Sequence, residues 1–119
     1  MIAIPDFSIS EEWIIHTTLK ERYGQGIEHQ HADGDIRLNA SDRELTSCPV
    51  IMWLADYCNF VVFETGDRRY RCQFFYKPFK QFGTGVREYN DLSECTVALL
   101  QARADQVAEE RGDFEVKRR

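Results

Sequence analysis

Hydrophobic side chains recur along the chain with two different spacings, which predict two helices and a central sheet. Ile15, Leu19 and Tyr23 are four residues apart, as on one face of a helix, and residues 92–107 carry a second stripe of this kind. Between them, residues 50–76 consist of short runs of aromatic and β-branched side chains, which are typical of strands. We therefore predict an α+β fold, in which an antiparallel sheet of three to five strands carries an N-terminal and a C-terminal helix on one face.

Polar residues mark the ends of the two predicted helices. Ser10 can cap the first helix, and Ser8 with Glu11 offers a rival capping box two residues earlier. Gly24 follows the last apolar residue of that stripe and ends the helix. Asp91 caps the second helix in the same way. Both helices are thus delimited by local signals alone.

The segment between the first helix and the central strands has two features. Asp33 and Gly34 lie between two short alternating runs, which predicts a hairpin turn at this dipeptide. Residues 47–58 can form a strand or a helix, because Ser47 as a cap and Pro49 in the first turn would also open a helix. We prefer the strand, since this segment is apolar and neighbours other strand-like runs.

The central hairpin decides which side chains share a face of the sheet. We predict a two-residue turn at Gly66-Asp67. This turn places Val62 opposite Arg71, and Glu64 opposite Arg69 as a cross-strand salt bridge. One face of the hairpin is then apolar and lies beneath the helices, and the other is a mixed aromatic and arginine face that no helix covers.

The mixed face suggests the first functional hypothesis. Aromatic and arginine side chains are enriched in protein interfaces, and a two-fold dimer can bury the same face on both copies. We expect a non-enzymatic interaction protein that forms a homo-oligomer, a dimer first, or binds a protein partner. The predicted partner-binding residues are Phe60, Val62, Arg69, Arg71, Phe75, Phe79 and Phe82.

Two other functional classes remain open. A small-molecule binder or minor enzyme would have a pocket between sheet and helices, with His16 or His29 as its polar group. Residues 68–87 contain six basic and no acidic residues among aromatics, a composition that binds single-stranded nucleic acid, but the net charge of −5 argues against it. The predicted lining of the small-molecule pocket is Trp53, Tyr57, Tyr70 and Tyr89.

The histidines are the only residues that suggest a metal. His29 and His31 project from one face of a strand at a spacing of about 7 Å, and Asp33 or Asp35 could add an oxygen ligand. The sequence supplies no fixed third and fourth ligand, so we predict no metal site. The two histidines are only weak candidates for metal ligands. We find no catalytic motif and expect no cofactor.

The cysteines and the N-terminus bear on the compartment. Cys48, Cys58, Cys72 and Cys95 form no CxxC pair, and the first residues lack the basic start of a signal peptide. No run approaches the roughly 20 apolar residues of a membrane span. We expect a cytoplasmic protein with free thiols, forming one domain over residues 1–119, of which 113–119 are a mobile tail.

Overall fold

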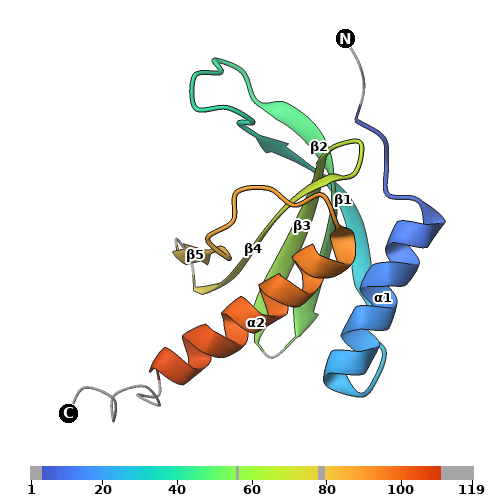
Figure 1. Cartoon of the computed structure of the whole chain (residues 1–119). Coiled ribbons are helices and arrows are strands. Elements are labelled where there is room, and N and C mark those ends of the chain that lie inside the picture. Colours follow the sequence, from blue (N-terminus) through green and yellow to red (C-terminus); the bar gives the residue numbers. More distant parts are fainter. Residues whose placement is uncertain (1–3, 56, 78–79, 111–119) are drawn as a thin grey trace.

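The protein is a five-stranded antiparallel sheet with both helices on one face (Figure 1). The computed structural model describes residues 4–55, 57–77 and 80–110, so the predicted tail at 113–119 lies outside the described residues. The strands follow one another in the sheet in the order of the sequence, which confirms the predicted α+β fold. The elements are α1 (Ile9–Tyr23), β1 (His29–Ile36), β2 (Thr46–Ala55), β3 (Cys58–Gly66), β4 (Arg69–Lys77), β5 (Lys80–Phe82) and α2 (Leu92–Glu110).

Helix α1 begins with the earlier of the two predicted capping arrangements. The Glu11 backbone N–H donates to Ser8 Oγ at 3.1 Å, and the Ser8 backbone N–H donates to Glu11 Oε1 at 2.7 Å. Ser10 therefore lies inside the helix and does not cap it. Gly24 ends the helix in the left-handed conformation, with φ at 75°, which a glycine adopts without strain. The box fixes the carboxylate of Glu11 at the start of the helix.

The predicted hairpin at Asp33-Gly34 is wrong, because residues 29–36 form one continuous strand that pairs with β2. Residues 47–55 belong to β2, as we preferred. A glycine is needed at position 34 for a different reason. A Cβ atom there would lie 3.0 Å from the side chains of both Phe63 and Val50. The glycine allows close packing across the uncovered face of the sheet and does not form a turn.

The central hairpin turns one residue later than predicted, at Asp67-Arg68. Arg68 adopts a left-handed φ of 57°, and the register shifts between Glu64 and Gly66, which leaves Thr65 as a bulge. Glu64 therefore lies opposite Tyr70 and not opposite Arg69. A shift of one residue in the pairing changes the set of β4 side chains that shares a face of the sheet with a given set of β3 side chains.

The core lies between the sheet and the helices and contains side chains that we predicted on the other face. Phe60 and Val62 are fully buried beneath the helices, so their placement on an uncovered face is wrong. They share this face with Tyr70 and Phe74 of β4. The residues of the core with no exposed surface include Ile15 and Leu19 of α1, Ile51 of β2 and Leu99 of α2.

The uncovered face of the sheet is partly closed by its own connecting segments. Arg71 lies on this face, opposite Phe63. Its Nη2 donates to the carbonyl of Leu38 at 2.7 Å, and Nη2 of Arg87 donates to the same carbonyl at 2.6 Å. These bonds attach the segment after β1 to β4 and to the chain before α2. Arg71 therefore has a structural role within the fold.

Candidate functional site in an acidic pocket

An acidic pocket of about 500 Å³ lies where α1 and α2 begin, beside the β3–β4 turn. The segment before α1, strand β3, the turn and the start of α2 all contribute to its wall. The ionisable groups that line it are five carboxyl groups, one guanidinium group and one tyrosine hydroxyl. These residues are Asp6, Glu11, Glu64, Asp67 and Asp91, with Arg68 and Tyr70.

Glu11 uses both of its oxygens in fixed hydrogen bonds. Oε1 accepts from the Ser8 backbone in the capping box, and Oε2 accepts from the hydroxyl of Tyr70. The ring of Tyr70 stacks on Phe7, with the ring centroids 6.4 Å apart, so the segment before α1 is anchored on the sheet. Burial, together with the bond to Glu11, raises the pKa of Tyr70. The phenol therefore stays protonated and donates its hydrogen to Glu11.

Glu64 is the buried acid of the pocket. Only 2% of its surface is exposed, and in the described part of the chain no donor reaches its Oε1. Burial, together with the charges of Glu11, Asp67 and Asp6, raises the pKa of Glu64 to about 8. Glu64 is therefore largely protonated at neutral pH. A buried carboxyl oxygen without a partner costs about 1–3 kcal/mol, so its retention requires an explanation.

The start of α2 forms another part of the pocket wall. Asp91 caps this helix by accepting from the Glu94 backbone N–H at 3.0 Å. The backbones of Tyr89 and Tyr70 exchange two hydrogen bonds of 2.8 Å, which hold the segment before α2 against β4. Sheet, helix starts and N-terminal segment are thus fixed relative to one another around Glu64.

This geometry is suited to an organic cation. A positive group that enters the pocket would favour the ionised form of Glu64, and the proton would leave. A metal ion needs several ligand atoms within a few ångströms, and among the described residues the one group that meets this condition is Glu12 with His29 and His31. The carboxyl groups of the pocket are spread around a larger space, which matches an ammonium or guanidinium group on a carbon chain.

The predicted ligand-binding tyrosines have different positions. Tyr70 lines the acidic pocket. Tyr89 is buried beside it, and its hydroxyl donates to Thr84 Oγ1 at 2.5 Å. Tyr57 is 93% exposed at the β2–β3 turn and contributes to none of the described pockets. The structure therefore brings Tyr70 and Tyr89 together and separates Tyr57 from them.

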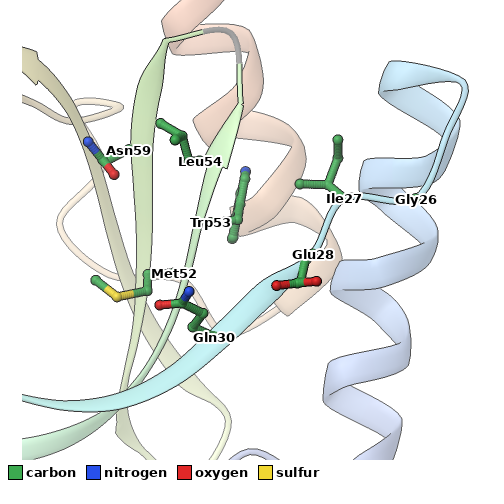
Figure 2. A pocket seen from close by; sticks show the side chains of 8 residues that line it. All are labelled: Gly26, Ile27, Glu28, Gln30, Met52, Trp53, Leu54 and Asn59. Atoms are coloured by element: carbon green, nitrogen blue, oxygen red, sulfur yellow. The ribbon is translucent and has the colours of Figure 1, made fainter.

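Trp53 lines another hollow, of about 450 Å³, at the sheet margin where β1 begins (Figure 2). Its indole and Ile27 lie on the helix side, while Met52 and Gln30 extend from the other face of the strands. The ring stacks on Phe60 at 5.4 Å, and among the described residues no acceptor reaches its Nε1. This hollow lacks the convergent charged groups of the acidic pocket.

The remaining predicted partner-binding residues do not form one surface. Phe82 lies on the helix side, where it stacks on Phe74 and Tyr76. Phe75 is on the uncovered face, and exposed Arg69 contacts Glu88 at 3.5 Å. Phe79 lies outside the described residues.

Sequence reasoning missed Glu64 as a functional candidate, although a signal is present. Glu64 is the one acid in an apolar strand and has the same alternation as Phe60 and Val62. That position predicts a buried carboxyl once the latter two are assigned to the core.

Comparisons with known proteins give no relative for this chain. No family model matches the sequence, and neither the curated proteins nor the solved structures contain a significant match. Neither α1 nor α2, the helices in the described part of the chain, is long and apolar enough to span a membrane. The candidate function therefore rests on the geometry of the acidic pocket.

Proposed function

We propose that this domain is a binding protein for cationic groups, which it holds in the acidic pocket. The ligand chemistry is an ammonium or guanidinium group, carried by a small amine or by a lysine or arginine side chain of a partner. The observation that carries the proposal is Glu64, which is almost fully buried in the pocket wall and whose Oε1 has no hydrogen-bond partner among the described residues.

The surroundings of Glu64 support a cation over an anion. Glu11, Asp6 and Asp67 all raise the pKa of Glu64 through their charge, and Arg68 is the one base of the lining. The side chains of Pro5, Ile14 and Leu92, which also line the pocket, provide an apolar wall for the carbon chain of an amine. This proposal is a changed form of the small-molecule hypothesis, with a carboxyl and not an imidazole as the polar group.

The proposal makes binding depend on pH in a defined direction. If the cation pairs with ionised Glu64, the affinity rises close to tenfold for each pH unit up to about pH 8, the pKa of this group, and then levels off. One proton is released for each cation bound below that pH.

Calorimetric titration in an amine-free buffer tests the proposal, with spermidine and short alkylammonium ions as one arm and lysine- or arginine-containing peptides as the other. We expect binding in at least one arm, which identifies the source of the cation. Glu64→Gln should weaken it at least tenfold at pH 8, while Glu21→Gln, which removes an exposed charge from α1, should not. Absence of binding in both arms, or equal binding by the two variants, would overturn the proposal.

The homo-oligomer predicted from the sequence remains a separate prediction. Leu54 is 64% exposed and Tyr57 93% exposed near the β2–β3 turn, so apolar surface is available there. Light scattering at micromolar concentration measures the oligomer directly. A monomer at these concentrations would contradict the prediction and leave the cation proposal unaffected.

A further inference from the structure

A second cluster of ionisable side chains, separate from the acidic pocket, joins α1 to β1. Nε2 of His31 lies 2.9 Å from Oε1 of Glu12, and Nε2 of His29 lies 3.3 Å from the same oxygen. The nitrogen and oxygen donor atoms of the three residues all lie within 4.8 Å of one another. None of the three lines the acidic pocket.

Strand and helix geometry produce this cluster. His29 and His31 pair with Trp53 and Ile51 of β2, so both imidazoles project from the face of the sheet that carries the helices. Helix α1 places Glu12 above them. The predicted oxygen ligands, Asp33 and Asp35, do not belong to the cluster; the carboxylate comes from a helix 17 residues before the first histidine.

We propose that Glu12, His29 and His31 form a binding site for a divalent transition metal ion, with zinc as the expected occupant. Two imidazoles and one carboxylate are a known ligand set for zinc that leaves a coordination position open. Hard cations such as magnesium prefer sites made of oxygen alone.

The two distances from the carboxylate to the imidazoles are close to those of a zinc site. Zinc holds imidazole nitrogen and carboxylate oxygen at about 2.0–2.2 Å in tetrahedral geometry, so two ligand atoms on one ion lie about 3.3 Å apart. The observed separations of 2.9 and 3.3 Å between Glu12 and the two imidazoles are close to this value. Binding replaces the proton shared by carboxylate and imidazole with the metal and requires only small side-chain movements.

The exposure of the three side chains allows the ion to enter. The side chain of His31 is 49% exposed, that of Glu12 35% and that of His29 18%. Both histidines lie on strand β1, and His31 is the more open of the two to solvent. A metal here would connect the first turns of α1 to the edge strand β1.

Zinc titration of the full-length, tag-free protein tests the proposal by calorimetry. We expect one zinc ion per chain and no binding of magnesium. Glu12→Gln and His31→Ala should each weaken zinc binding at least tenfold. His16→Ala is the matched control, because it removes the third histidine of the chain and leaves the cluster intact. Equal affinity in all these variants, or magnesium binding as tight as zinc, would overturn the proposal.

Two measurements on the unmutated protein keep the test independent of how the variants fold. Zinc should shift the ring resonances of His29 and His31 in NMR spectra and leave those of His16 in place. Cobalt should give a spectrum without the thiolate charge-transfer band that a cysteine ligand produces. A shift at His16 alone, or a strong thiolate band, would assign the metal to other residues and refute the site.

Discussion

Replacing Glu64 by glutamine separates the energetic effect of its ionisation from the effect of its shape. Glutamine has nearly the same volume as a protonated glutamate but cannot ionise. In the folded protein the pKa of Glu64 is raised from 4.5 to about 8. A carboxyl whose pKa is raised by folding stabilises the fold below its unfolded pKa, and this stabilisation is lost as the pH rises through the folded pKa.

The magnitude follows from the two pKa values. Between pH 5 and pH 8 the folded protein holds a proton on Glu64 that the unfolded chain has mostly released. Each pH unit in this window therefore lowers the free energy of unfolding by close to 1.4 kcal/mol. The difference in stability between the Glu64→Gln variant and the parent should grow by about 3 kcal/mol over this range, in favour of the variant.

Urea denaturation at a series of pH values from 5 to 8 measures this difference. Every other titratable group is common to the two proteins, so their contributions cancel in the comparison. Glu21→Gln, at an exposed position on α1, should give a curve parallel to that of the parent. Parallel curves for Glu64→Gln and the parent would show that Glu64 is ionised or solvated in the folded protein and would refute the reasoning about the pocket.

Four further substitutions test the fold. Phe60→Ala should lower the free energy of unfolding by about 3–5 kcal/mol and Phe63→Ala by less, in urea melts, because only the former is fully buried. Gly34→Ala should destabilise by about 1–3 kcal/mol in the same assay, because its Cβ would lie 3.0 Å from Phe63 and Val50. Arg71→Lys should speed hydrogen exchange in residues 37–45, because it loses the bond to the Leu38 carbonyl.

The sequence predicted those features that local chemistry determines. The end of α1 at Gly24 and its inward stripe depend on residues a few positions apart, and both are found, while of the two caps offered the structure has the rival one, Ser8 with Glu11, and not Ser10. The fold class followed from these helices and the strand-like runs between them. The cluster of Glu12, His29 and His31 could be predicted only in part, because alternation places the two histidines on one face but Glu12 comes from a distant helix.

The errors arose where packing between strands decided the outcome. Asp33-Gly34 has the composition of a turn, but the glycine serves the close approach of the Phe63 ring. Gly66-Asp67 also has the composition of a turn, but the bulge at Thr65 moves the turn to the next pair of residues. Neither a ring that packs two strands away nor a bulge can be identified from the alternation of one strand.

The bulge at Thr65 also explains why Glu64 is buried with an Oε1 that no donor reaches in the described part of the chain. In the predicted register Glu64 would face Arg69, whose guanidinium would neutralise it. That register would bring Arg69 and Arg71 to the face of β4 beneath the helices, whereas the observed one brings Tyr70, Cys72 and Phe74.

Burial of a large apolar side chain contributes about 1.5–3 kcal/mol, whereas burial of an unpaired arginine is strongly unfavourable. The core therefore selects the observed register, and Glu64 is left facing a phenol whose hydroxyl is already bound to Glu11. Burying Oε1 of Glu64 without a donor costs less free energy than burying the apolar side chains gains, so the fold tolerates it. The same packing that buries the aromatic residues thus leaves the Glu64 carboxyl opposite Tyr70, without an arginine facing it.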